Sequence, residues 1–220
     1  MYKSHEPPSH QHPSHRHPSR RPAVLAAALA LALAAGHVFA ADPENVIDLR
    51  GEPARAALAR YEATLAAAPA DVAALKNAGI VLHQLARSEP KPETVERAER
   101  YLQEARRLDP NDAETAAWLG STITMKALFE TDPGRQTFHV KAGTRLLDGA
   151  VRAAPDNRVV RLTRAYNSLE LPAFLGRTRY AVEDLGRYLQ LCDGQPCKPA
   201  DVSEAREKLA LAERIVEQNR

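Results

Sequence analysis

The sequence predicts an all-α fold built from helical hairpins, and three observations support that prediction. The stretch from Asp71 to Pro110 reads as two amphipathic helices joined by a polar turn. Similar segments that close on proline occur at Ala66–Asp71, Arg106–Asp112 and Arg152–Asn157. No alternating pattern typical of β-strands occurs along the 220 residues. We therefore expect one helical domain of about 180 residues, which is long enough to bury a continuous core.

The units that end in these closing prolines share an internal spacing. Pro69, Pro110 and Pro155 lie 41 and 45 residues apart. Each second helix carries a small residue, a large apolar or aromatic residue, another small residue and the proline, at Ala57, Tyr61, Thr64 and Pro69, at Ala98, Leu102, Ala105 and Pro110, and at Gly143, Leu147, Ala150 and Pro155. The eighth position of each first helix is also small, at Gly79, Gly120 and Ala165. Small residues let helix backbones approach closely, and large ones fill the notch opposite.

A hairpin with this pattern, closing on proline, resembles the tetratricopeptide repeat. The resemblance covers roughly residues 49–191 and implies a right-handed solenoid of hairpins with a C-terminal capping helix. Several features depart from the family: the units exceed its length of about 34 residues, Leu75 replaces a tryptophan, Trp118 lies two residues late, and the last unit ends at Asp193 without proline. The alternative is an unrelated bundle of alanine-rich helices.

The first 40 residues have the layout of a secretory signal peptide. Residues 1–22 are rich in histidine, proline and serine, and two arginines precede the uncharged apolar run Ala23–Gly36. Val38 and Ala40 are small residues before a cleavage site that follows Ala40. The run is short for a membrane-spanning helix, which needs about 20 apolar residues. We therefore expect a periplasmic or secreted protein; the alternative is a retained leader that tethers the protein to the membrane.

Cleavage of this leader changes the charge balance. The whole chain carries +2 and residues 1–40 carry +3, so the remainder is nearly neutral at −1. This balance gives no electrostatic reason to expect nucleic-acid binding. A tract near the start of the leader contains five histidines that could bind divalent metal, namely His5, His10, His12, His15 and His17. Cleavage would remove them, and because His83 and His139 lie in different units, we expect no metal site in the remainder.

The remainder is expected to form the following elements. Residues 41–48 are a short polar lead-in, and the repeat array spans 49–220, beginning with a helix over 49–67. The three full units pair Asp71–Arg87 with Thr94–Leu108, Asp112–Phe129 with Phe138–Ala153, and Asn157–Leu171 with Thr178–Leu191. Asp71, Asp112 and Asn157 are suitable N-caps. A capping helix over 201–218 begins with the capping-box pair Asp201 and Glu204.

Two cysteines flank the segment DGQP between the last unit and the capping helix. In an exported protein, Cys192 and Cys197 predict a disulfide that closes a tight loop. Restricting the unfolded chain in this way stabilises the fold by roughly 2 kcal/mol. A metal site would need further ligands, and no histidine lies in this region.

The sequence contains none of the common catalytic motifs. G-x-S-x-G, H-E-x-x-H, the Walker loop and the Rossmann glycine pattern do not occur. Acidic residues alternate with arginine, as in ERAERYLQEARR, which is typical of a solvated helix face. We therefore expect a non-catalytic protein without a cofactor; the alternative is an envelope enzyme or metal-handling protein built on a helical frame.

The resemblance implies a concave groove lined by the first helices of the units. The partner-binding residues are then Lys76, Ile80, His83 and Gln84, followed by Ser121, Thr124 and Met125, and by Leu162, Tyr166 and Leu169. Such a mixed surface suits an extended peptide or a partner helix, and the alternative role of each side chain is packing between helices. The family's carboxylate clamp is not expected, because Lys76 matches one position and Ile80 and Trp118 replace others.

Insertions between the two helices of each unit predict a second surface along one edge. They are Ser88–Glu93, Glu130–Thr137 and Pro172–Arg177. Phe129, Phe138 and Phe174 lie near them, either as part of a binding face or to hold the loops on the core. The predicted function is a scaffold or adaptor of the bacterial periplasm that binds a peptide or partner protein through the groove and this edge. The sequence does not identify the partner.

Overall fold

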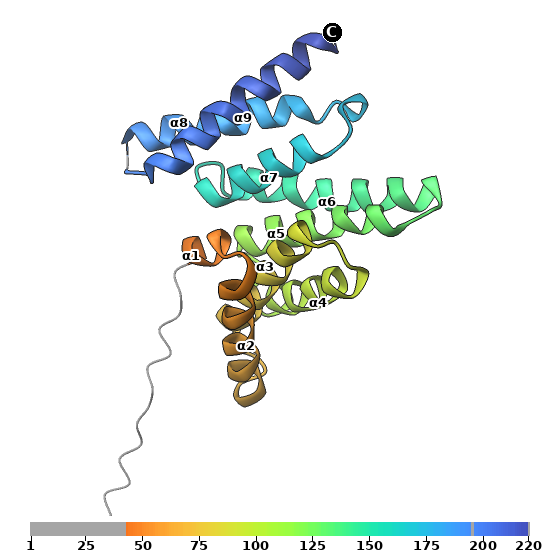
Figure 1. The fold of residues 1–220 in the computed structure, drawn as a ribbon, viewed down its shortest axis with the longest axis vertical. Helices are drawn as coiled ribbons and strands as arrows, with labels where there is room; N and C mark the ends of the chain where they lie inside the picture. The colour runs from red at the N-terminus through yellow and green to blue at the C-terminus, as the bar shows by residue number, and fades with distance from the viewer. Residues whose placement is uncertain (1–42, 195, 220) are drawn as a thin grey trace, which may run out of the picture. The chain divides into compact units, whose positions relative to one another are not determined.

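The computed structural model describes residues 43–194 and 196–219. Within these ranges the chain is helical and contains no strand, in agreement with the all-α prediction (Figure 1). None of the described helices is both long and apolar enough to cross a membrane. The predicted signal peptide, with its histidine tract, and residues 41–42 of the lead-in lie outside the described residues.

The described elements follow one another with short connections. The α-helices are α1 (Pro43–Asp48), α2 (Gly51–Ala67), α3 (Val72–Ser88), α4 (Pro92–Leu108), α5 (Ala113–Met125), α6 (Pro133–Ala153), α7 (Arg158–Glu170), α8 (Thr178–Gly194) and α9 (Pro199–Gln218). Two 3₁₀ helices, η1 (Lys126–Phe129) and η2 (Ala173–Leu175), follow α5 and α7. Six of the α-helices pack as three pairs, each with a first and a second helix: α3 with α4, α5 with α6, and α7 with α8.

The first helix of each pair begins at the N-cap that the sequence predicts. The side chains of Asp71, Asp112 and Asn157 each accept a hydrogen bond from a backbone amide in the following turn, at 2.9, 2.9 and 3.0 Å. These bonds satisfy amides that have no partner within the helix. The closing prolines lie in the turns just before these caps, because proline interrupts the helix that precedes them.

Two predicted boundaries are wrong. Helix α6 begins at Pro133 and not at Phe138, so most of the predicted insertion Glu130–Thr137 is helical. Asp132 caps this helix by accepting a hydrogen bond from the Arg135 amide at 2.7 Å, and proline is well tolerated in the first helical turn. The connection that remains is only residues 130–132.

The start of the capping helix also differs from the prediction. Helix α9 begins at Pro199, its N-cap residue is Lys198, and no side chain caps it. The predicted capping box of Asp201 and Glu204 is therefore wrong, and both residues lie inside the helix. Pro43–Asp48 is a short helix, where the sequence predicted only a polar lead-in.

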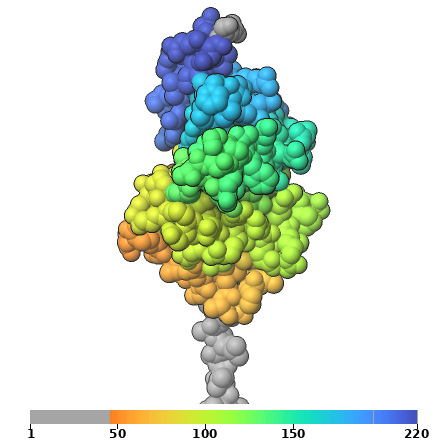
Figure 2. Space-filling view, turned by 90° about the vertical axis from the view of Figure 1, so that its right-hand side faces the viewer, coloured from red at the N-terminus to blue at the C-terminus, as the bar shows by residue number. Residues whose placement is uncertain are grey.

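From α2 onward, helices that follow one another in sequence pack together, and the first helices of the pairs also contact one another. Helix α5 contacts both α3 and α7, while α9 packs on α8 (Figure 1). In the space-filling view, successive pairs lie next to one another in sequence order (Figure 2). The side chains of α3, α5 and α7 therefore meet on one face, which positions the site described below.

The small residues of the predicted pattern lie at helix contacts. A Cβ added at Gly120 would be 2.6 Å from the carbonyl oxygen of Gly143 in α6. At Gly79, it would be 2.5 Å from the Leu102 Cγ in α4. Ala165 is fully buried in a cluster with Leu185. The other small packing positions, Ala98, Ala105 and Ala150, are also buried.

Charged side chains hold the third pair together. Arg161 and Arg164 of α7 donate hydrogen bonds to Asp184 of α8, at distances from 2.6 to 2.9 Å. All three side chains are buried, although the sequence predicted charged residues on solvated faces. Burial raises the pKa of the Asp184 carboxyl, and the hydrogen bonds from the two guanidinium groups oppose that rise.

Candidate functional site

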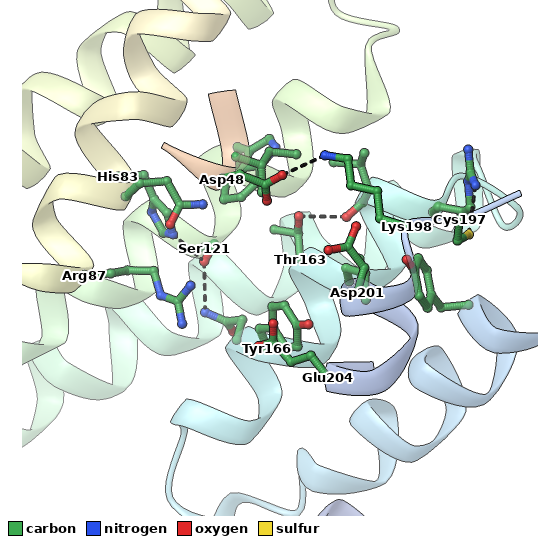
Figure 3. Close-up of a pocket in the computed structure, with 18 of the residues that line it drawn as sticks. Asp48, His83, Arg87, Ser121, Thr163, Tyr166, Cys197, Lys198, Asp201 and Glu204 are labelled. Atoms are coloured by element: carbon green, nitrogen blue, oxygen red, sulfur yellow. Dashed lines mark hydrogen bonds and ion pairs between the residues drawn. The ribbon is translucent and has the colours of Figure 1, made fainter. Parts of the chain in front are cut away.

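A cavity of about 210 Å³ lies where the first helices of the three pairs meet (Figure 3). Helices α3, α5 and α7 provide its floor and walls. Residues 47–50, at the end of α1, and the beginning of α9 close its sides. Five of the predicted groove residues line it, namely His83, Gln84, Ser121, Leu162 and Tyr166.

The other five predicted groove residues take part in packing or in ion pairs. Ile80 is fully buried in the core, and Leu169 packs in the cluster of α7, α8 and α9. Met125 packs beside α4, and the Thr124 hydroxyl donates a hydrogen bond to the backbone carbonyl of its own helix at 2.7 Å. Lys76 pairs with two acidic residues of the next unit at 2.9 and 2.8 Å. For these residues the structure favours the packing alternative.

Hydrogen bonds define the tautomer of His83 at the cavity floor. The Thr122 hydroxyl donates its proton to the Trp118 carbonyl oxygen at 2.8 Å, so it can only accept from His83 Nδ1, at 3.1 Å. Nδ1 therefore carries the proton, and Nε2 presents a lone pair. The only described group near Nε2 is the Ser121 hydroxyl, at 3.5 Å, which is a long hydrogen bond.

The Ser121–His83 pair resembles a nucleophile beside a base, but its electrostatics do not suit that role. Burial, with a smaller contribution from the positive charges of Arg87 and Arg50, lowers the pKa of His83 to about 3. An imidazole with this pKa is neutral at pH 7 and is a weak base, whereas a general base works best with a pKa near the working pH. The pair is better suited to hydrogen bonding than to proton abstraction.

Three polar atoms on buried side chains of the cavity lining have no hydrogen-bond partner in the described part of the chain. They are Gln84 Oε1, Trp118 Nε1 and Asn167 Oδ1. The three side chains are between 2% and 5% exposed. Leaving such an atom unpaired typically costs about 1–3 kcal/mol, so native proteins rarely keep several together. The cluster therefore marks a place where a ligand can complete the hydrogen bonding.

An ion pair between the end of α1 and the segment just before α9 closes one side of the cavity. The ammonium group of Lys198 lies 2.8 Å from the Asp48 carboxylate, a pair separated by 150 residues in sequence (Figure 3). The disulfide between Cys192 and Cys197, which the sequence predicts, holds the segment that carries Lys198. Arg158 of α7 also donates hydrogen bonds to this segment, at Pro196 O and Cys197 Sγ.

Sequence reasoning missed most of the charged residues around the cavity. Asp48 lies in the segment read as a lead-in, Arg50 lies at the start of the predicted helix 49–67, and Asp201 and Glu204 were assigned to a cap. No local pattern could have revealed them, because they come together only when α1 and α9 fold against the same face. Asn167 could have been found, since it lies one residue after the predicted groove position Tyr166.

The predicted loop edge carries exposed apolar side chains. Phe138 and Phe174 are exposed, and so is Leu128 of η1. Phe129 instead packs against the core beside Met125, as the alternative interpretation expects. No cluster of three or more metal-ligating side chains occurs in residues 43–194 and 196–219.

Comparisons with known proteins leave the cavity as the main guide to function. No family model, no curated protein and no solved structure matches this chain.

Proposed function

We propose that the chain is a non-catalytic binding protein, in which hairpins of the tetratricopeptide type stack as a right-handed solenoid and hold a segment of a partner polypeptide in the cavity. The repeated hairpins, with contacts running from α3 to α5 to α7, support the solenoid. The observation that carries the binding role is the cluster of unpaired buried polar atoms on those helices, at Gln84, Trp118 and Asn167. Peptide amides and polar side chains can complete their hydrogen bonding.

The size of the cavity limits what enters it. Pockets for small molecules typically measure about 300–1,000 Å³, and this cavity is smaller, at about 210 Å³. A partner helix, with a diameter of about 10–12 Å including its side chains, would not fit. A side chain of an extended segment matches this space better, so of the two groove ligands that the sequence suggests we favour the extended peptide.

We also propose that the protein acts after export, in the bacterial periplasm or outside the cell. The signal-peptide layout of residues 1–40 supports this location. The disulfide between Cys192 and Cys197 supports it independently, because such bonds persist mainly in oxidising compartments.

A displayed library of random peptides, selected on the purified protein, tests the binding role. We expect enriched peptides to bind the wild type and to bind Leu162→Trp at least about tenfold more weakly, because the larger side chain fills the cavity. Phe174→Ala, which alters only the exposed edge, is the control and should bind normally. A library without binders, or binders that tolerate Leu162→Trp, would contradict the proposal.

A second candidate surface is the loop edge, because Phe138, Phe174 and Leu128 expose large apolar side chains there. Exposed apolar residues that gather on one surface often mark an interaction site. Deleting Glu130–Thr137 is a poor test, since it removes the first turn of α6. The double substitution Phe138→Ser and Phe174→Ser leaves the helices intact; loss of partner capture by this variant, together with normal capture by Leu162→Trp, would favour the edge over the cavity.

A further inference from the structure

We propose that the cavity recognises a positively charged, hydrogen-donating group, namely the ammonium or guanidinium group of a lysine or arginine side chain on the partner segment. This inference rests on the proposed function and specifies its ligand. Three features of the lining support it: the kind of hydrogen-bonding atom left unpaired, two carboxylates without an ion-pair partner among the described residues, and the aromatic ring beside those carboxylates.

The unpaired atoms on the floor are mainly acceptors. Gln84 Oε1 and Asn167 Oδ1 are buried oxygen atoms that accept no hydrogen bond from the described residues. The lone pair of His83 Nε2 has only the long contact with Ser121. Against these three acceptors stands one unpaired donor, Trp118 Nε1. A lysine ammonium offers three donors and an arginine guanidinium five, and neither has an acceptor.

The formal charge of the cavity lining is balanced, with four basic and four acidic side chains. Arg87 pairs with Glu170 at 2.6 Å, and Lys198 pairs with Asp48 at 2.8 Å. Arg50 donates to two backbone carbonyl oxygens, at 2.6 and 2.8 Å, and its charge also interacts with that of Glu204. Arg158 donates hydrogen bonds to Pro196 O and Cys197 Sγ. Asp201 and Glu204 of α9 form no ion pair with any residue the structure describes, so they are the charges of the lining that a cationic ligand can pair with.

Asp201 and Glu204 are these two carboxylates, and they lie one turn apart on α9. Figure 3 shows both reaching the cavity beside Tyr166, while Arg87 enters from the α3 side. Burial raises the pKa of Tyr166, and the charge of Glu204 raises it further, which places this ring close to negative charge. A cation between the carboxylates and the ring would gain both ion pairing and a cation–π contact.

The single tryptophan of the chain makes the test specific to this site. Because Trp118 is the only tryptophan and lines the cavity, its intrinsic fluorescence reports ligand entry directly. The probes are the capped peptides acetyl-Gly-X-Gly-amide, in which X is lysine, arginine, norleucine, citrulline or glutamate. Norleucine and citrulline keep the length of lysine and arginine but lack the charge.

We expect the lysine and arginine peptides to change the fluorescence saturably, and to bind at least about tenfold more tightly than their neutral counterparts. The double variant Asp201→Asn and Glu204→Gln should remove most of that preference. The matched control is Glu207→Gln with Glu213→Gln, which removes the same charge from exposed positions of α9 outside the cavity and should bind as the wild type does. Circular dichroism and urea unfolding check that each variant is folded.

The outcomes distinguish failure of this inference alone from failure of the proposed function. Equal binding of the norleucine and lysine peptides, or unchanged arginine binding by the Asp201→Asn and Glu204→Gln variant, overturns the inference and leaves peptide binding intact. A glutamate peptide that binds most tightly also overturns it. The absence of a saturable signal with every peptide overturns both proposals. Butylamine is a further probe: if it binds as tightly as the lysine peptide, the cation is recognised but its source is a free amine, which contradicts the partner-segment proposal.

Discussion

The second and third helical pairs bring their helices together by different physical means. Between α5 and α6, Gly120 and Gly143 let two backbones touch, so the contact contains no charge. Between α7 and α8, a buried carboxylate on Asp184 receives hydrogen bonds from Arg161 and Arg164. The first contact depends on the absence of side chains, and the second depends on long side chains with exact partners.

This difference means that similar hairpins in one chain have different weaknesses. A backbone contact fails when any atom is added, because neither backbone can move aside without displacing its helix. A buried ion network fails when an atom is removed, because the remaining charges lose their partner in a poorly solvated place. The following predictions test this contrast, beginning with the largest expected effect.

Removal of the Asp184 carboxylate from the third pair should cause the largest loss of stability. We expect Asp184→Ala to lower the free energy of unfolding by about 4 kcal/mol, because two buried guanidinium groups lose their main partner. Urea unfolding followed by circular dichroism measures this loss. The control is Asp156→Ala, whose carboxylate pairs with Arg187 at 2.6 Å on the surface and should cost less than about 1 kcal/mol. Equal losses in the two variants would show that burial of the network is unimportant.

Addition of one methyl group to the second pair should have the next largest effect. We expect Gly143→Ala to destabilise the fold by about 3 kcal/mol, since its Cβ would meet the Gly120 carbonyl oxygen and lie 2.9 Å from the Thr124 amide nitrogen. Gly149→Ala is the control in the same helix, where the nearest atom is the end of the Arg152 side chain at 3.8 Å. That variant should gain up to about 1 kcal/mol from helix propensity. A harmless Gly143→Ala would contradict the close-contact interpretation.

The sequence predicts the glycine contact of the second pair but not the ion network of the third, because of the range over which each contact is encoded. The N-caps and the small residues follow local spacing, so Asp112 and Gly120 could be assigned from sequence alone. The Asp184 network could not, because arginine and aspartate are seldom fully buried and their spacing also fits a solvated helix face. The cavity lining could be predicted only in part, for the same reason. Gln84 and Tyr166 follow the groove pattern, whereas the Asp48–Lys198 ion pair joins residues 150 positions apart.

Acid should destabilise the fold through His83 of α3, which is buried against Thr122 of α5. Its pKa is about 3 in the folded protein and about 6.5 when unfolded. The unfolded state therefore binds more protons below pH 6.5, so stability falls as the pH decreases towards 3. Between pH 6 and pH 5, we expect the wild type to lose about 1.2 kcal/mol more than His83→Gln, measured by urea unfolding at both pH values. Identical losses would show that His83 is not buried as a neutral group.

The smallest effect should come from Gly79, where the added methyl group meets a side chain and not a backbone. Its Cβ would be 2.5 Å from Leu102 Cγ, but the nearest backbone atom, the Ala98 carbonyl oxygen, is 3.3 Å away. Because Leu102 can shift, and because alanine favours the helix, we expect Gly79→Ala to cost only about 1 kcal/mol net.

A double-mutant cycle separates a side-chain obstacle from a backbone obstacle. Leu102→Ala alone should cost about 2–5 kcal/mol, and combining it with Gly79→Ala should cost about 1 kcal/mol less than the sum, because the new methyl group occupies the space that the leucine leaves. The parallel cycle of Gly143→Ala with Thr124→Ser should remain additive, since the serine removes the Thr124 methyl carbon but leaves the Gly120 carbonyl oxygen and the Thr124 amide in place. Rescue in the second cycle would mean that the α5–α6 contact is made by side chains after all, and the contrast between adding and removing atoms would then fail.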